Sequence, residues 1–260
     1  EVARIFGYDN IPTLPVQGAS QAGVNSETTA SLAELRHRLV SRGFNEAITF
    51  SFVSPSAQRL FDPDSVPVAL KNPISSDLAV MRTSLLPGLA GAAAHNIKRQ
   101  ISRIRLFETG LRFLPHDNAL AQTPTLALLL CGARSPEGWS AQPSAVDFYD
   151  LKGEIEALLA AAALPVLFRP AVRPGLHDGQ TAEVVLGDTV IGILGRLHPT
   201  VASELDLPDK TFVAELDLAE VLQRAMPDYQ DISRYPEVRR DLAVVLDKQV
   251  AASVALDLVK

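Results

Sequence analysis

The chain has 260 residues, 47% hydrophobic and 21% charged, with a formal net charge of −6 at pH 7. This length is sufficient for one large domain, or two smaller ones, with a substantial buried core. The net charge argues against a protein whose whole surface attracts nucleic-acid phosphate, although a local basic patch stays open. The single cysteine, Cys131, excludes a disulfide framework and a zinc site of several thiolates, and it favours the reducing cytoplasm.

The start of the chain predicts a helix end and a linker over residues 1–25. Glu1-Val2-Ala3-Arg4 is typical of a helix interior, so we expect the chain to be a piece of a longer polypeptide. Pro12 and Pro15 disfavour helix, and the polar residues that follow have no periodicity. The longest apolar run, residues 157–164, is much shorter than the roughly 18 apolar residues of a membrane span, so we expect no membrane association.

Residues 29–53 predict a helix that runs directly into a strand. Ser31 and Glu34 have capping-box spacing, and Gly43 stands where a left-handed residue ends a helix. Residues 46–53 alternate between apolar and polar positions, which indicates a strand. The apolar positions of the helix are Leu32, Leu35 and Leu39, and those of the strand are Ile48, Phe50 and Phe52.

The next segment predicts a short strand over residues 66–70 and an alanine-rich helix over residues 88–100, with Pro87 in the first helical turn. Four basic side chains follow near the end of this helix: Lys98, Arg99, Arg103 and Arg105. The favoured interpretation is a helix C-terminus and the solvent face of a strand. A contact for an acidic partner or for RNA phosphate is the alternative.

Residues 103–114 predict a hairpin whose turn is Thr109-Gly110, and residues 126–131 predict a strand buried on both faces. A helix is expected over residues 150–162, with Leu151, Ile155 and Leu158 on its apolar side. Further strands are expected over residues 165–168, 182–186, 190–194 and 211–216. Antiparallel strands with interspersed helices, but no regular βαβ order, indicate an α+β fold.

After Pro227 the pattern changes to a strand over residues 239–247 and a helix over residues 252–258, which indicates the start of a second unit. No general catalytic motif accompanies these elements. The sequence has no Gly-x-Ser-x-Gly, phosphate-binding loop or Gly-x-Gly-x-x-Gly motif, and its five histidines lack metal-ligand spacing.

Six runs resemble, in the same order, the C-terminal half of bacterial phenylalanine–tRNA ligase beta subunits. They are residues 1–12, 72–88, 107–110, 147–153, 195–199 and 235–243. The resemblance implies an α+β module over residues 26–228, whose antiparallel sheet and helices are like the catalytic module of class II aminoacyl-tRNA synthetases. It also implies that residues 233–260 begin a ferredoxin-like anticodon-binding domain.

The same resemblance implies that this module is not catalytic. Catalytic relatives end a Gly-Arg-Val-Tyr-Arg run with an arginine that binds the ATP α-phosphate, whereas this chain has Leu114 at that position. Gly195-Arg196 does not have the spacing of the second ATP-binding arginine. Arg112 is a possible substitute, expected on the strand face opposite Leu114. A module that keeps ATP or amino-acid binding, or a free RNA-binding module, is the alternative.

In this family the module supports a catalytic alpha subunit within an α2β2 tetramer that uses ATP and Mg²⁺ and binds tRNA(Phe). The resemblance implies a magnesium role for Glu1, whose further ligands would lie outside this chain, and a tRNA phosphate contact for Arg239 and Arg240. The candidate contacts to the alpha subunit are Leu32, Leu35, Leu39, Ile48, Phe50 and Phe52. The alternative for these six side chains is an ordinary role in the core.

Overall fold

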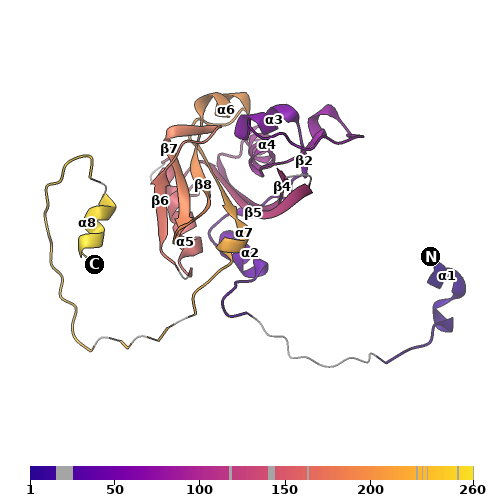
Figure 1. The fold of residues 1–260 in the computed structure, drawn as a ribbon, viewed down its shortest axis with the longest axis horizontal. Coiled ribbons are helices and arrows are strands. Elements are labelled where there is room, and N and C mark those ends of the chain that lie inside the picture. Colours follow the sequence, from indigo (N-terminus) through magenta and orange to yellow (C-terminus); the bar gives the residue numbers. More distant parts are fainter. Residues whose placement is uncertain are drawn as a thin grey trace. The chain divides into compact units, whose positions relative to one another are not determined.

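The computed structural model shows two units, Glu1–Met226 and Pro227–Lys260, which are described separately (Figure 1). Within them the structure describes residues 1–15, 26–116, 119–139, 144–162, 164–226, 228–229, 231–232, 234–250 and 252–259. The first described segment holds helix α1 (Val2–Phe6) and the 3-10 helix η1 (Tyr8–Asn10).

A seven-stranded sheet with the order β1-β4-β5-β9-β8-β7-β6 is the centre of the first unit. Every neighbouring pair is antiparallel except β1 and β4, which are parallel. The strands are β1 (Asn45–Glu46), β4 (Arg103–His116), β5 (Ala119–Gly132), β6 (Val166–Pro170), β7 (Leu176–Leu186), β8 (Thr189–Leu197) and β9 (Thr211–Asp217). A second, two-stranded sheet pairs β2 (Phe52–Val53) with β3 (Val80–Met81). The α+β class is therefore confirmed.

Helices cover both faces of the large sheet. Figure 1 shows α3 (Pro55–Phe61), α4 (Leu86–Ile97) and α6 (Pro199–Glu204) together in the upper part of the view. In the lower part lie α2 (Leu32–Ser41), α5 (Phe148–Leu159) and α7 (Leu218–Val221). Each group packs on its own hydrophobic cluster. Along β5, Leu126, Leu128 and Leu130 belong to the α5 side, and Ala127, Leu129 and Cys131 to the α4 side. This confirms a strand buried on both faces.

The local helix signals are confirmed. The Ser31 hydroxyl accepts a hydrogen bond from Glu34 N (3.1 Å) at the start of α2, and Gly43 has a φ of +83° just after its end. Helix α4 has its proline in the first turn, and α5 buries Leu151, Ile155 and Leu158 as expected. Asp147 and Asp150 form a capping box at the start of α5.

The strand expected over residues 46–53 is wrong. The chain pairs with β4 only at Asn45–Glu46 and joins the second sheet at Phe52–Val53. Between them the Thr49 hydroxyl donates to Glu108 Oε2 (2.7 Å), while Ile48 and Phe50 are 90% and 69% exposed. The alternating pattern therefore reflects one anchored side chain between two exposed ones, not a sheet face.

The hairpin turn expected at Thr109-Gly110 is also wrong. Strand β4 continues through both residues, which pair with Leu126 and Thr125 of β5. Gly110 is required by packing, because a Cβ there would lie 2.3 Å from Nη2 of Arg82. Residues 66–70 form only an isolated bridge, between Ala69 and Val80, instead of the expected strand. The 3-10 helix η2 (Ser76–Leu78) lies between them and β3.

In the second unit, helix α8 (Ala252–Val259) confirms the expected helix. The strand expected over residues 239–247 is wrong, because no strand is present among residues 234–250 and 252–259. Leu242, Val244 and Val245 are consequently exposed. Across the described parts of both units, no helix combines the length and apolar character needed to cross a membrane.

Candidate functional site

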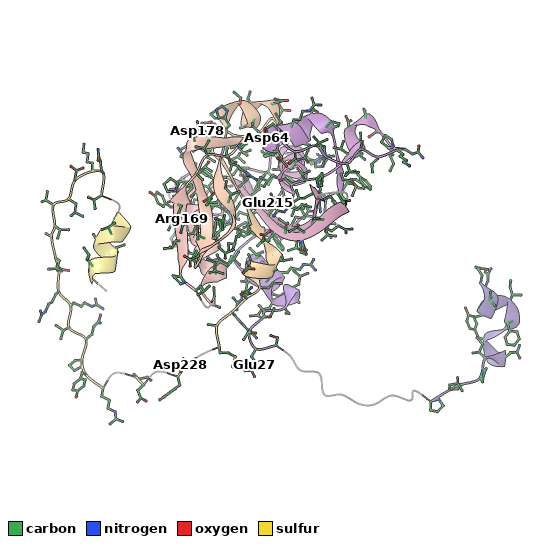
Figure 2. All side chains as sticks on the ribbon, in the orientation of Figure 1. Glu27, Asp64, Arg169, Asp178, Glu215 and Asp228 are labelled. Atoms are coloured by element: carbon green, nitrogen blue, oxygen red, sulfur yellow. The ribbon has the colours of Figure 1, made fainter. Side chains whose placement is uncertain are left out.

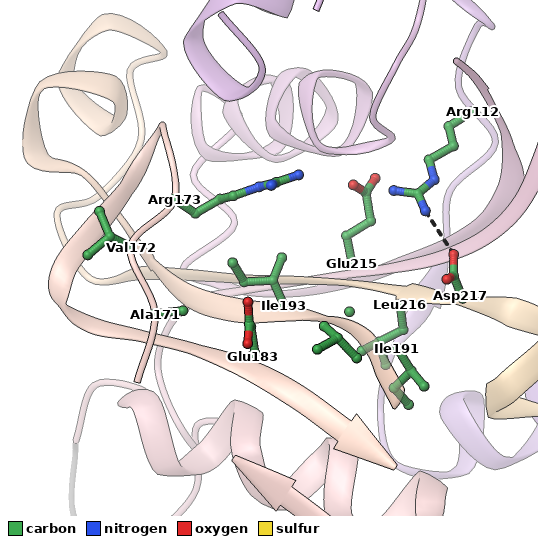
Figure 3. A pocket seen from close by; sticks show the side chains of 12 residues that line it. Arg112, Ala171, Val172, Arg173, Glu183, Ile191, Ile193, Glu215, Leu216 and Asp217 are labelled. Carbon is green, nitrogen blue, oxygen red and sulfur yellow. Dashed lines mark hydrogen bonds and ion pairs between the residues drawn. The ribbon is translucent and has the colours of Figure 1, made fainter. Parts of the chain in front are cut away.

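Two adjoining cavities lie on the α4 side of the sheet, over strands β4, β9 and β8. Figure 3 shows the first of them. Their volumes are about 210 and 270 Å³, and both are lined by Arg112, Arg173, Ile193 and Glu215. We call these two cavities together the sheet-face cavity. Leu114, for which the resemblance implies the loss of an ATP-binding arginine, lines the second part of this cavity.

Glu215 of β9 stands at the centre of this cavity. Its Oε1 accepts hydrogen bonds from Leu85 N (2.7 Å) and from the Ser84 hydroxyl (3.0 Å), which fixes the entry of α4 onto the sheet. Burial raises the pKa of the Glu215 carboxyl, and the Leu85 N–H, Arg112, Ser84 and Arg173 oppose that rise. Figure 3 shows Arg173 and Arg112 approaching Glu215 from opposite sides.

Arg112 and Leu114 line the same cavity, so the expectation that they occupy opposite faces is wrong. Residues two apart on a strand share a face, and both belong to β4. Arg112 does not point freely into the cavity, because its Nη2 donates to Asp217 Oδ1 at 2.8 Å. Nη2 of this guanidinium is therefore paired, whereas its Nε is buried without a hydrogen-bond partner among the described residues. Leu114, two residues further along β4, offers no hydrogen-bond donor.

The charges of the sheet-face cavity do not fit a triphosphate. Arg112 and Arg173 are its only arginines among the described residues, and they are outnumbered by the carboxylates. Asp64 and Glu215, both labelled in Figure 2, line the second part of this cavity. The five lining carboxylates are Asp62, Asp64, Glu183, Glu215 and Asp217. The arginines that could attract a phosphate are thus fewer than the carboxylates that would repel it. This balance of charge disfavours ATP in this cavity.

A buried ion pair next to the cavity takes up a further arginine. Arg82 Nη1 lies 2.7 Å from Glu108 Oε1, and both side chains are buried. Arg82 also donates to Leu111 O (2.9 Å) and to the Thr49 hydroxyl (3.1 Å). A guanidinium satisfied in this way is part of the scaffold and cannot reach a ligand.

Sequence reasoning did not identify Arg82, Arg173 or Glu215 as parts of this site. A signal for Glu215 existed, because it is a carboxylate within the otherwise apolar run Phe212-Val213-Ala214-Glu215-Leu216. Arg82 also stood within one of the runs that carry the family resemblance, but its partner Glu108 is distant in sequence. No sequence pattern marks Arg173.

The structure separates the six candidate contacts to an alpha subunit into three groups. Leu35 and Leu39 are 4% and 0% exposed within the core, so they are not surface contacts, and this part of the expectation is corrected. Leu32 and Phe52 are partly buried. Ile48 and Phe50 are exposed on the segment between β1 and β2. Only these last two have the exposure that an interface residue needs.

Glu1 does not by itself fit a magnesium site. Its Oε2 lies 2.5 Å from Arg4 Nη2, and the described residues contain no group of three or more His, Cys, Asp or Glu side chains placed to hold a metal. Mg²⁺ requires an octahedral set of oxygen ligands, which one paired carboxylate does not supply.

The arginines expected to contact RNA have different surroundings. Arg239 pairs with Glu237, with Nη2 and Oε2 3.0 Å apart, and Arg240 is exposed. The cluster at residues 98–105 is not one basic surface. Lys98 pairs with Asp206 (2.8 Å), and Arg105 is buried against Glu154, which corrects its expected place on a solvent face. Arg105 also lies 4.6 Å over the ring of Phe44.

Comparison with known proteins gives a consistent result. A family model described as "Phenylalanyl tRNA synthetase beta chain CLM domain" matches residues 11–218. The chain is 45% identical to the phenylalanine–tRNA ligase beta subunit of Pseudomonas syringae pv. tomato, over 100% of this chain and 33% of that protein. The beta subunits of Hahella chejuensis and Methylococcus capsulatus are also 45% identical, over 98% and 100% of this chain and 32% and 33% of theirs. The chain spans about a third of the length of these relatives.

Proposed function

Because this chain belongs to the phenylalanyl-tRNA synthetase beta chain family, we propose that it is a non-catalytic structural module of the ligase. In this proposal residues 26–228 keep the class II synthetase sheet, and the assembled enzyme joins phenylalanine to tRNA(Phe). Six antiparallel strands with one short parallel strand at the edge support that assignment. Residues 1–25 would be the end of a preceding domain with a linker, and residues 233–260 would begin the ferredoxin-like domain.

The observation that carries the non-catalytic role is the pairing of the arginines on the α4 side of the sheet. Arg82 is paired with Glu108 and Arg112 with Asp217, while Leu114 stands at the position of the ATP-binding arginine. A charged hydrogen bond to a ligand contributes about 1.5–3 kcal/mol, and these pairs leave few such bonds for a phosphate. A sheet retained without its phosphate ligands serves as a scaffold.

The proposed partner of this scaffold is the catalytic alpha subunit, in an α2β2 assembly. Ile48 and Phe50 are exposed on a segment whose middle residue, Thr49, is held by Glu108. Apolar side chains on a fixed backbone bind a partner with little loss of conformational entropy. We place the alpha subunit contact at these two residues, with Leu32 and Phe52 at its margin.

The remaining components belong to the whole ligase in this proposal. ATP and Mg²⁺ act in the assembled enzyme and are not held by this chain. Glu1 would complete a magnesium site with carboxylates outside this chain, and Arg239 and Arg240 would contact tRNA phosphate. The compartment would be the cytoplasm.

A second candidate function is a module that still binds and activates an amino acid with ATP. The observation in its favour is Arg173, which lines the sheet-face cavity and forms no ion pair with any residue that the structure describes. Pyrophosphate exchange with ATP and phenylalanine separates the two functions. We expect no exchange from this chain alone, and exchange that Arg112→Ala abolishes would establish the second function instead.

Co-elution with the alpha subunit tests the scaffold role. The unchanged chain should associate at micromolar concentration, and the double variant Ile48→Ser/Phe50→Ser should associate at least about tenfold more weakly. Ile74→Ser is the matched control, because Ile74 is equally exposed on another loop. A chain that does not associate, or a control variant that weakens association equally, contradicts the proposed interface.

A further inference from the structure

A third cavity lies on the opposite, α5 side of the sheet, away from the sheet-face cavity. Its volume is about 710 Å³, within the range of roughly 300–1,000 Å³ that small-molecule sites occupy. It is formed by the first turn of α5, strands β6 to β8 and the start of β9. We call it the α5 cavity. Nothing in the scaffold role uses it.

One wall of the α5 cavity is aromatic. Phe148 and Tyr149 begin helix α5, with their ring centroids 5.8 Å apart in an edge-to-face arrangement, and Phe168 lines the cavity from β6. Tyr149 is 75% exposed, so most of its ring is available to a ligand. Lys152 Nζ lies 4.5 Å from the centroid of Phe168. Phe148 and Phe168 are half-buried, so Tyr149 supplies the exposed ring, and an exposed ring favours planar ligands with a π face.

The polar groups of the cavity divide into paired and unpaired ones. Asp147 is engaged by the first turn of α5 and by Arg134, and Arg196 is engaged by Asp209. The side chains of Asp178, Gln180 and Lys210 form no hydrogen bond or ion pair with any residue that the structure describes. The α5 cavity thus has an unpaired carboxylate, amide and ammonium.

Two of these unpaired groups come from an irregular part of the ladder between β7 and β8. The register of β7 against β8 shifts between Leu176 and Thr181, and Asp178 and Gln180 lie within that shift. Asp178 is labelled in Figure 2. Bulges redirect side chains that a regular ladder would place elsewhere, and they are common beside binding sites.

We propose that the α5 cavity binds one nucleotide. The base would stack on the aromatic wall, Asp178 and Gln180 would accept and donate hydrogen bonds at its edge, and Lys210 would contact its phosphate. The carboxylate of Asp178 would accept from an exocyclic amino group, which guanine, adenine and cytosine carry and uracil lacks, so these three bases should bind better than uracil. The nucleotide is either free or an unpaired nucleotide of an RNA chain, since both present the same base and phosphate. This site is independent of the scaffold role and of the alpha subunit contact.

Titration of the chain and of the assembled ligase tests the proposal. The four nucleoside 5′-monophosphates, single-stranded RNA tetramers and inorganic phosphate are the probes, with binding followed by calorimetry and ligand-observed NMR. We expect saturable nucleotide binding with a dissociation constant of about 1 mM or tighter. Binding of tetramers together with monophosphates would identify a site that accepts free nucleotides. Binding of tetramers alone would identify RNA as the source.

Two variants connect that binding to the α5 cavity. Tyr149→Leu should weaken binding about tenfold through lost stacking, and Lys210→Gln should weaken it and reduce its salt dependence. Tyr8→Leu and Lys71→Gln are matched controls at exposed positions outside the cavity, and they should have no effect. Circular dichroism checks that each variant is folded. Three results would overturn the proposal: no saturable binding, equal binding of inorganic phosphate, or binding that Tyr149→Leu leaves unchanged.

Discussion

Arg82 and Glu108 form a buried ion pair, with 2.7 Å between Nη1 and Oε1, at the point where three separate chain segments meet. Thr49 donates to the same carboxylate, and Leu111 O accepts from Arg82 Nε. The pair therefore connects strand β4 to the segment after β3 and to the loop that carries Ile48 and Phe50. The proposed interface with the alpha subunit depends on this connection for its shape.

Glu108→Gln should lower the free energy of unfolding by about 3–5 kcal/mol, because it leaves the buried Arg82 guanidinium without a counter-charge. Urea denaturation measures the change. The double variant Arg82→Met/Glu108→Leu removes both charges and should lose less stability than the single variant. Lys98→Gln, which removes an exposed ion pair with Asp206, is the control and should have a much smaller effect. A double variant no more stable than Glu108→Gln would contradict this account.

Gly110→Ala should destabilise the protein, whereas Gly91→Ala should stabilise it. A Cβ at Gly110 would meet Arg82 Nη2 at 2.3 Å, so the buried ion pair would have to shift. At Gly91, within α4, a Cβ would have no heavy atom within 4 Å, and alanine is favoured over glycine in a helix by about 0.5–1 kcal/mol. Thermal melting of both variants checks the opposite signs. Equal shifts in the same direction would contradict the packing argument.

Cys131 should be unreactive in the folded protein. Burial raises the pKa of its thiol to about 11, while a hydrogen bond with Thr211 opposes the rise. At pH 8 the thiolate, which is the reactive form, is then roughly one part in a thousand. Reaction with a chromogenic disulfide at pH 8 should be slow in buffer and fast in denaturant. Rapid reaction without denaturant would show that the β5 core opens readily around Cys131.

The features that were predicted correctly from the sequence depend on neighbouring residues. The start of α2 follows from Ser31 and Glu34, which are three residues apart, and its end follows from the backbone freedom of Gly43. Strand β5 was recognised because an apolar run reports burial on both faces. In each case the signal lies within a few positions along the chain, although the strands that pair with β5 include the distant β9.

The errors arose where the deciding contact is distant in sequence. Gly110 has the local signature of a turn, but the reason for the glycine is the side chain of Arg82. Ile48 and Phe50 alternate like a strand, but Thr49 is held by Glu108. The same limit applies to the sheet-face cavity, since Glu215, Arg112 and Arg173 meet only through the order of the strands.

Glu215 should make the stability of the protein depend on pH above the ordinary range of a glutamate. Burial raises the pKa of this carboxyl in the folded state above its ordinary value of 4.5, so the folded state holds this proton more tightly than the unfolded state does. Between the unfolded and folded pKa values the folded state binds more protons, and the free energy of unfolding falls as the pH rises. Below 4.5 both states are protonated, and this contribution to stability is complete.

Glu215→Gln removes this titration and should therefore change the slope. The difference in unfolding free energy between the unchanged protein and Glu215→Gln should decrease as the pH rises from 4 to 7, whatever its absolute size. Glu137→Gln, at an exposed position, is the matched substitution, and urea denaturation at several pH values gives all three profiles. An opposite slope would mean that Arg112 and Arg173 dominate over burial. Glu215 would then be an ordinary ion-pair partner and not a desolvated anchor for α4.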